Sequence, residues 1–413
     1  MRTLVWVVCI AGASALAQAR LVADDQPKNI DERATHEQGA LIKVDRPEEN
    51  RLKINAFCLN ADGNILAACG NGPGEVRVFD GDGEFLRFWE IPVKPESINT
   101  APDGTVLVAG SGKLFRYSID GEQLQQADSP HATAINTGAE KLREHAIEQL
   151  KQQARQIANP VEQYRQLLEQ LETKKKKDGL NDQEQRILDI LPTHIERLAE
   201  RQQNSPKPQE ITEEAIQQQV KFMTEHKMRM CSISADDDHV YVATPALAGW
   251  GFEVWRLDPD FQNGEVVVSE LRGCCGQMDV QCCKSGVYVA ENSRHRVVRF
   301  TSDGEQTATW GKQDRTGLDG FTSCCNPMNV CFNKSGDVYT AESNTGRIKR
   351  FSADGDFLEF VGDVKLVPGC KNVSIAVSSD DERVYMLDIT RNHIVLMKRK
   401  TSEDATDSRA GAE

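Results

Sequence analysis

The sequence predicts an all-β fold that is built from about six similar units of four strands each. Two stretches, 273–311 and 323–362, align almost residue for residue, and in each of them strand-like segments alternate with turns. Asp-Gly pairs recur at matching places, 303–304 and 354–355, and such pairs supply the positive φ angles of tight hairpin turns. Repeats of 40–50 residues with four strands each are typical of the blades of a β-propeller.

Weaker copies extend the array in both directions and carry turn residues at the same two places. They cover 53–91, 95–128, 228–271 and 368–398. The last copy stops after its third strand, and an open strand edge would be a liability in a closed ring. We expect the apolar segment Ala40–Val44 to supply the missing outer strand. The predicted order is an N-terminal segment (20–52), two blades (53–128), four further blades (226–398) and a polar, disordered tail (399–413).

Three segments at equivalent places in the repeats carry a family resemblance. VYVAENSRHRVVRF at 287–300 and VYTAESNTGRIKRF at 338–351 resemble NHL repeats, and VYMLDITRNHIVLM at 384–397 is a fainter version. The resemblance implies a six-bladed NHL-type propeller. NHL propellers include ligand-binding scaffolds and enzymes, so the resemblance leaves the function open. Gluconolactonase-like and amidating-lyase propellers share this general architecture, but their catalytic residues do not match onto this chain.

Residues 138–225 interrupt the array between the second and third blades and are rich in Gln, Glu and Lys. Apolar residues recur there at helical spacing: Ile147, Leu150, Ile157, Val161, Tyr164, Leu168 and Leu171 in one run, and Ile187, Leu188, Leu191, Ile195 and Leu198 in another. Asn181 and Glu184 form a capping-box-like start to the second run, and a shorter helix follows Thr212. We predict an α-helical hairpin insertion. It either packs on itself or on the propeller, or serves as a docking or dimerisation arm.

The first residues predict export. A basic residue, a short apolar run and the small-residue pattern Ala17-Gln18-Ala19 together read as a secretory signal peptide (1–19) that is cleaved after Ala19. The expected location is therefore periplasmic or secreted. With 63 acidic and 49 basic residues the net charge is −14, which disfavours nucleic acid as a partner. We find no segment that is long and apolar enough to span a membrane.

Cysteines are the unusual chemical feature. The chain has 12, and 11 remain once Cys9 is removed with the signal peptide. Those expected around one mouth of the propeller, where the chain enters the innermost strands, are Cys274, Cys275, Cys324, Cys325 and Cys370, with Cys231 at a similar depth. Cys58 and Cys331 occupy equivalent places within first strands and are further candidates for the ligand-binding face. Three interpretations stay open: disulfides, a thiolate site for Cu, Zn or Fe, and a redox-active thiol pair.

Polar residues follow the second strands of two blades at matching positions. They are Glu291, Asn292, Glu342 and Asn344, with His295 nearby. They could supply oxygen ligands to a hard cation. The resemblance to NHL repeats implies instead that residues at this point make hydrogen bonds within turns. We find no catalytic motif of a known class. The sequence therefore predicts a scaffold that binds a protein or a small molecule at a cysteine-rich mouth. The alternative is a propeller enzyme that uses the same face, either a thiolate-metal redox protein or a lyase- or lactonase-type hydrolase.

Overall fold

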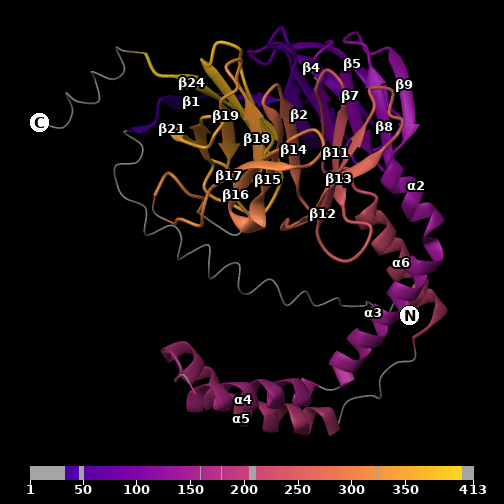
Figure 1. Cartoon of the computed structure of the whole chain (residues 1–413), viewed down its shortest axis with the longest axis vertical. Helices are drawn as coiled ribbons and strands as arrows, with labels where there is room; N and C mark the ends of the chain where they lie inside the picture. The colour runs from indigo at the N-terminus through magenta and orange to yellow at the C-terminus, as the bar shows by residue number, and fades with distance from the viewer. Residues whose placement is uncertain are drawn as a thin grey trace, which may run out of the picture. The chain divides into compact units, whose positions relative to one another are not determined.

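The computed structural model describes residues 33–45, 51–158, 160–177, 179–203, 211–315, 317–322 and 325–401. The predicted signal peptide, Cys324 and almost all of the polar tail lie outside these residues. The chain divides into two compact units. One consists of Met1–Ala134 together with Lys227–Glu413, and the other is Ile135–His226. Many of their elements are labelled in Figure 1.

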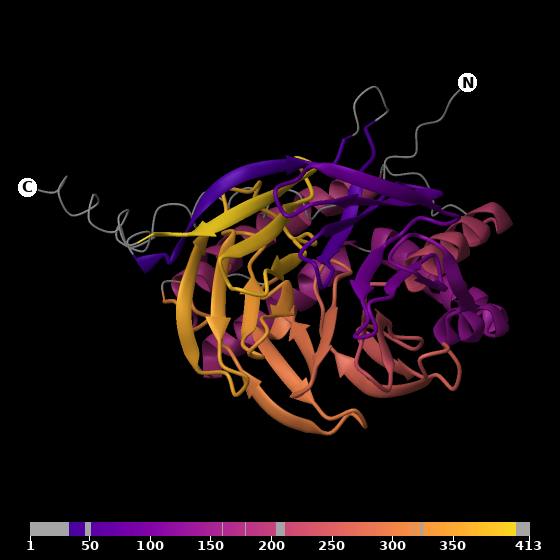
Figure 2. The same cartoon turned by 90° about the horizontal axis from the view of Figure 1, so that it is seen from above.

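The first unit contains, among the described residues, six sheets of four antiparallel strands each. Sheet one consists of β2 (Ile54–Leu59), β3 (Ile65–Cys69), β4 (Gly74–Phe79) and β5 (Phe85–Ile91). Sheet two consists of β6 (Ser97–Thr100), β7 (Val106–Gly110), β8 (Lys113–Tyr117) and β9 (Gln123–Asp128). Sheets three and four are β10 (Ser232–Ala235), β11 (Val240–Pro245), β12 (Phe252–Leu257), β13 (Glu265–Leu271), and β14 (Asp279–Cys283), β15 (Gly286–Glu291), β16 (Arg296–Phe300), β17 (Gln306–Trp310). Sheet five is β18 (Asn329–Phe332), β19 (Val338–Ala341), β20 (Arg347–Phe351), β21 (Phe357–Asp363). Seen from above, the sheets follow one another around a common centre (Figure 2), so the protein is a six-bladed β-propeller.

The sixth sheet joins the two ends of the propeller. Its order is β1-β24-β23-β22, from β1 (His36–Lys43), β24 (His393–Arg399), β23 (Arg383–Asp388) and β22 (Ile375–Val377). β1 runs antiparallel to β24, from His36 opposite Arg399 to Lys43 opposite His393. The outer strand of the last blade therefore comes from the segment upstream of the first blade, and it begins four residues before Ala40.

Alternation of side chains along the strands builds the core between neighbouring blades. In β15, Val287 and Val289 pack into the core shared with the third blade, whereas Tyr288 and Ala290 pack into the core shared with the fifth. All four side chains are buried. A strand whose two faces are both covered accounts for its almost continuous run of apolar residues. The Asp-Gly turns have the expected conformation, with φ of 84° at Gly304 and 97° at Gly355.

The second unit is helical, and it contains more helices than the predicted hairpin. Its elements are the end of α2 (Pro130–Thr137), then α3 (Ala139–Ala158), α4 (Pro160–Lys177), α5 (Asp182–Gln203) and nearly all of α6 (Glu213–Lys227). The sequence predicts one helix across 147–171, but a new helix begins at Pro160, because proline fits the first turn and lacks the N–H that a helix interior needs. The capping box is confirmed: Glu184 N donates to Asn181 Oδ1 (2.9 Å), and Asn181 N donates to Glu184 Oε2 (3.1 Å).

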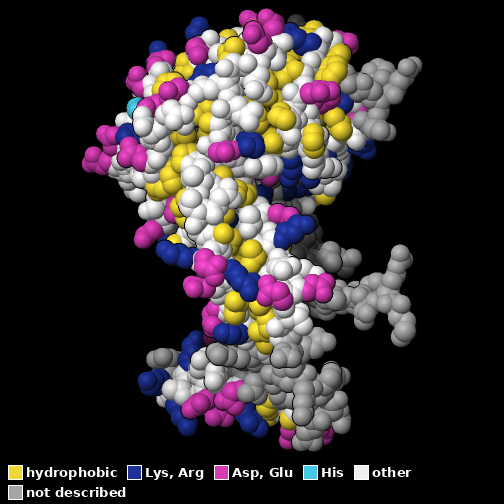
Figure 3. All heavy atoms as spheres, turned by 90° about the vertical axis from the view of Figure 1, so that its right-hand side faces the viewer, with side chains coloured by type: hydrophobic (Ala, Val, Ile, Leu, Met, Phe, Trp, Pro, Cys, Tyr) yellow, Lys and Arg dark blue, Asp and Glu magenta, His cyan; other side chains and the backbone are white. Residues whose placement is uncertain are grey.

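Surface charge is mixed: Figure 3 shows acidic and basic side chains interspersed on the visible face of the molecule.

In the second unit, Arg143 on α3 forms two hydrogen bonds with the carboxylate of Glu213 on α6 (3.0 and 2.9 Å). Within the described residues, every helix is too short or too polar to cross a lipid bilayer.

Candidate metal centre

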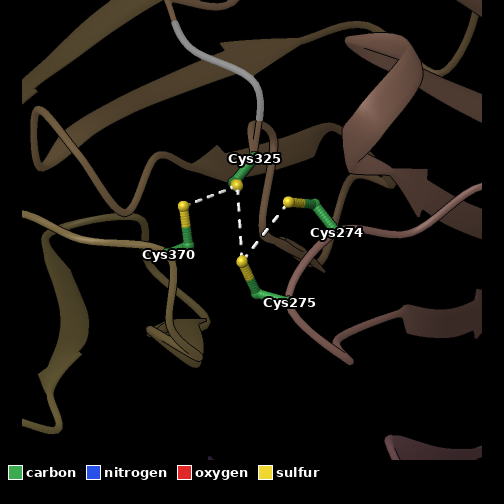
Figure 4. A group of neighbouring side chains, drawn as sticks. All are labelled: Cys274, Cys275, Cys325 and Cys370. Atoms are coloured by element: carbon green, nitrogen blue, oxygen red, sulfur yellow. Dashed lines mark hydrogen bonds between the residues drawn. The ribbon is translucent and has the colours of Figure 1, made fainter. Parts of the chain in front are cut away.

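Four thiols come together in the structure, as Figure 4 shows: Cys274, Cys275, Cys325 and Cys370. Their four Sγ atoms all lie within 4.8 Å of one another. The Sγ–Sγ distances are 3.3 Å between Cys274 and Cys275, 4.0 Å between Cys275 and Cys325, and 2.7 Å between Cys325 and Cys370. We call these four residues the thiol cluster.

The thiol cluster is a product of the repeat. Strand pairing places Asp279 opposite Ala290 and Asn329 opposite Ala341. In the sixth blade Ile375 lies opposite Met386, and Leu387 N donates to Ser374 O (3.0 Å), so Ser374 is the residue equivalent to Asp279 and Asn329. In this register three of the cysteines occupy one equivalent position in the fourth, fifth and sixth blades, namely Cys275, Cys325 and Cys370. Each is followed three residues later by a fully buried apolar side chain: Met278, Met328 and Val373 respectively. The second and third blades carry apolar residues at the cysteine position, Val93 and Met228.

A carboxylate holds each of the three loops that lead into these blades. The loop N–H groups donate at 2.8 Å from Arg272 to Glu291, at 3.1 Å from Thr322 to Glu342 and at 3.1 Å from Val367 to Asp388. In every case the donor lies three residues before the equivalent cysteine. All three carboxylates are fully buried and follow or end the second strand of their blade. We call this arrangement the carboxylate clamp.

The clamp and the cysteine occur in the same blades. The positions equivalent to the clamp carboxylates in the first three blades hold Cys69, Gly110 and Thr244, none of which carries a carboxylate. In the structure Glu291 and Glu342 therefore hold backbone, which agrees with their matching positions in the two blades. Each side chain holds a backbone N–H three residues before a cysteine of the thiol cluster.

A second device fixes Cys274 and Cys275. Cys274 N donates to the side chain of Asn292 (2.7 Å), whose amide donates to Gln277 O (3.1 Å). Gln277 N closes a turn by donating to Cys274 O (3.2 Å). The two central residues, Cys275 and Gly276, have φ of 56° and 69°, as in a type I′ turn. Asn or Gly is usual at the first of these positions, so a cysteine there occupies a backbone conformation that disfavours it.

The cluster is open on one side. Cys325 is fully buried and Cys274 half-buried, whereas Cys275 and Cys370 are exposed. Burial, together with the neighbouring thiols Cys274 and Cys370, raises the pKa of Cys275 to about 12. The hydrogen bond with Cys370, followed by burial, raises the pKa of Cys325. The neighbouring thiols thus oppose ionisation of Cys275 and Cys325, and a cation bound among them would reverse the effect.

The size of the cluster suits one metal ion. Four thiolates around an ion at about 2.3 Å in tetrahedral geometry lie about 3.8 Å apart. The distances of 3.3 and 4.0 Å lie on either side of this value. The pair Cys325–Cys370, at 2.7 Å, would have to open by about 1 Å. A cluster of several irons would hold its cysteines farther apart than a single ion does.

The other residues predicted for this face are placed elsewhere. Cys231 directly precedes β10 and lies outside the thiol cluster; its Sγ is 3.7 Å from Gly276 O, and it packs against the core between the third and fourth blades. Cys58 belongs to the core between the first two blades, and Cys331 packs against the core between the last two. His295 has φ of 55° and ends a short 3₁₀-helix (Asn292–Arg294). Asn344 is half-buried in the loop after β19.

One functional candidate escaped the sequence analysis. Asp279 lines a small cavity of about 30 Å³ on the propeller axis, together with Ser97, Ser232, Asn329 and Ser374. Burial raises the pKa of its carboxyl to about 6, although hydrogen bonds from Val330 N and from the Gln281 amide favour the ionised form. The signal in the sequence was the polar residue that opens the inner strand of successive blades.

Comparisons with known proteins concern the fold. No family profile and no curated protein sequence matches the chain. Similar solved structures include virginiamycin B lyase from Staphylococcus aureus with quinupristin (10% identity, 86% of this chain and 83% of that chain, TM-score 0.42). They also include a gluconolactonase from Xanthomonas campestris (10% identity, 88% of this chain and 99% of that chain, TM-score 0.42). A third is the WD40 domain of Neurospora crassa Pan2 (10% identity, 91% of this chain and 98% of that chain, TM-score 0.44). Similarity at this level carries no inference, and the assignment as a propeller rests on the six four-stranded sheets.

Proposed function

We propose that this protein is a metal-binding propeller that holds one soft metal ion, Zn²⁺ or Cu⁺, at its mouth through Cys274, Cys275, Cys325 and Cys370. The observation that carries the proposal is the convergence of four Sγ atoms, within 4.8 Å, from three consecutive blades. Thiolate sulfur selects Zn²⁺, Cu⁺ and iron–sulfur clusters over hard cations. The compactness of the cluster favours the single ion.

The surroundings of the cluster support a ligand set over a group of staples. The four thiols form one connected group and not two separate pairs, because Cys325 lies 2.7 Å from Cys370 and 4.0 Å from Cys275. The clamp aligns the three equivalent cysteines around one point, as the ligands of a metal must be aligned. The left-handed backbone of Cys275 places a thiol where glycine or asparagine would fold more easily.

The open side of the cluster defines the wider role. Because Cys275 and Cys370 are exposed, a bound ion would face the solvent at the mouth, within reach of a protein or small-molecule ligand. The proposal places this scaffold in the periplasm or outside the cell, as an NHL-type repeat protein. That part rests on the segment 1–19 and on the repeats at 287–300 and 338–351. The helical insertion is then a candidate arm for docking or dimerisation.

The test is metal stoichiometry with a thiol count. The full chain is purified without chelator, reduced, and offered Zn²⁺ or Cu⁺ in competition with a chromophoric chelator. We expect one ion per chain for the unaltered protein and for Cys231→Ser, which removes a cysteine outside the cluster. We expect loss of the ion in Cys325→Ser. Protein that binds no ion when fully reduced, or equal binding by the two variants, would refute the proposal.

A further inference from the structure

The four thiols are not equally spaced. Cys325 and Cys370 form the closest pair, at 2.7 Å, and they come from equivalent positions in adjacent blades, 45 residues apart in the chain. A disulfide bond needs about 2.05 Å, so a small rotation of the two side chains brings the atoms together. Cys274 and Cys275 are sequence neighbours, whose Cα atoms are about 3.8 Å apart and therefore closer than most disulfides allow.

The two members of this pair differ in access. Cys370 is exposed and follows Gly369, beside which an added Cβ would meet nothing within 4 Å. Cys325 is fully buried. A dissolved disulfide can therefore reach the sulfur of Cys370, whereas Cys325 is placed to act on what has become attached there.

The backbone on both sides of the pair is already fixed. The clamp holds Thr322 N on Glu342 and Val367 N on Asp388, each three residues before its cysteine. Asn326, the residue after Cys325, accepts a hydrogen bond from Ser343 N (2.8 Å). Formation of a bond between the two sulfurs therefore requires movement of the two side chains, and these hydrogen bonds can stay in place.

We propose that the metal site is redox-gated: oxidation of Cys325 and Cys370 to a disulfide, by exchange with a low-molecular-weight disulfide, expels the ion. This inference rests on the proposed function, since it concerns the release of the same ion. It names the Cys325–Cys370 pair as the gate and Cys370 as the residue that reacts first.

The exchange balances in two steps. The Cys370 thiolate attacks one sulfur of the disulfide RSSR, forms a mixed disulfide and releases RS⁻. The Cys325 thiolate then attacks Cys370 Sγ, forms the Cys325–Cys370 bond and releases the second RS⁻. RSSR takes up the two electrons that the protein thiols lose. Cys274 and Cys275 remain as thiols that bind protons, and the ion departs because two of its four ligands are gone.

The experiment uses the reduced full chain loaded with Zn²⁺ and exposed to glutathione disulfide. Release is followed with a chromophoric zinc chelator, and disulfides are located by mass spectrometry of alkylated peptides. We expect one Zn²⁺ released for each Cys325–Cys370 disulfide formed, and recovery of binding after dithiothreitol. Cys231→Ser should behave as the unaltered protein. Cys370→Ser should form no disulfide at Cys325 at the same glutathione disulfide concentration, a readout that does not depend on zinc.

The outcomes separate the gate from the metal site itself. Reduced protein that binds Zn²⁺ but keeps it in glutathione disulfide overturns the gate and leaves the proposed function standing. Release accompanied by a different disulfide, such as one involving Cys275, also overturns the gate as assigned. Reduced protein that binds no Zn²⁺ refutes the proposed function, and the gate is refuted with it.

Discussion

The carboxylate clamp of the fifth blade is coupled to a buried ion pair, and Glu342→Gln tests both. Glu342 and Lys349 are fully buried, with 2.7 Å between Oε1 and Nζ. The second oxygen of Glu342 accepts hydrogen bonds from Thr322 Oγ1 (2.6 Å) and Thr322 N (3.1 Å). Lys349 also donates to Gly320 O, and its ammonium lies 4.4 Å from the centre of the Phe321 ring. This network thus holds Thr322 and Gly320, three and five residues before Cys325.

Glutamine keeps the shape of the side chain and removes the charge. The Lys349 ammonium is then left buried without its counter-charge, and removal of one partner of a buried ion pair costs about 3–5 kcal/mol in the free energy of unfolding. The loop that carries Cys325 loses an anchor in the same change. We therefore expect metal affinity at the thiol cluster to fall about 10- to 100-fold, as it does when residues that orient ligands are altered.

Urea unfolding followed by tryptophan fluorescence measures the loss in free energy of unfolding. Trp89, Trp250, Trp255 and Trp310, which are the tryptophans among the described residues, all belong to the first unit, so the signal reports on the propeller. Glu291→Gln is the matched control. Its partners Arg294 and Arg296 keep 44% and 29% of their side-chain surface exposed, so water solvates them. The free energy of unfolding should therefore fall by less than half as much in Glu291→Gln as in Glu342→Gln.

A double variant completes the design. Glu342→Gln with Lys349→Met removes both charges, and a buried pair replaced by uncharged side chains can fold about as stably as the original. We expect it to regain most of the stability that Glu342→Gln loses. The reasoning is refuted if Glu342→Gln unfolds within about 1 kcal/mol of the unaltered protein, or if the double variant is no more stable than the single one.

Two further predictions concern buried polar groups away from the thiol cluster. The raised pKa of Asp279, about 6 against an ordinary 3.8, means that ionisation opposes folding, so this contribution lowers stability as pH rises from about 4 to about 6. The free energy of unfolding of Asp279→Asn should therefore exceed that of the unaltered protein by up to about 3 kcal/mol above pH 6, and should equal it below pH 4. Denaturant titrations that give the same difference at every pH would contradict this. Thr244 is fully buried, and its hydroxyl has no hydrogen-bond partner among the residues that the structure describes. Thr244→Val should therefore raise the free energy of unfolding by about 1 kcal/mol, and a decrease would show that the hydroxyl is satisfied.

The repeat made the fold predictable. Asp-Gly turns and matched strands at 273–311 and 323–362 define one blade, and the weaker copies follow from it. The break at Pro160 was missed because apolar spacing continues from Ile157 to Val161 across the end of one helix and the start of the next. Such a pattern reports which face is buried and does not report where a helix ends.

The sequence predicted that the four cysteines of the candidate site meet at one mouth, but it did not predict how the loops that carry them are held. Repeat symmetry brought Cys274, Cys275, Cys325 and Cys370 to one mouth, as the structure also does. Cys231 was grouped with them because it stands near a first strand, but it lies immediately before β10, where side chains enter the core between blades. The carboxylate clamp depends on strand register and on the path of each loop, which one sequence does not specify.

The ring is closed by β1 and β24, and this closure bears on when the thiol cluster can form. Cys370 leads into β22, which belongs to the same sheet as the closing strands. During synthesis the first strand must wait for the last blade, since its partner β24 is made some 350 residues later. A four-thiol site therefore becomes available only when nearly the whole propeller has been made. Capture of the metal would then be one of the last events in the maturation of the chain, and a bound ion would mark a propeller that has closed.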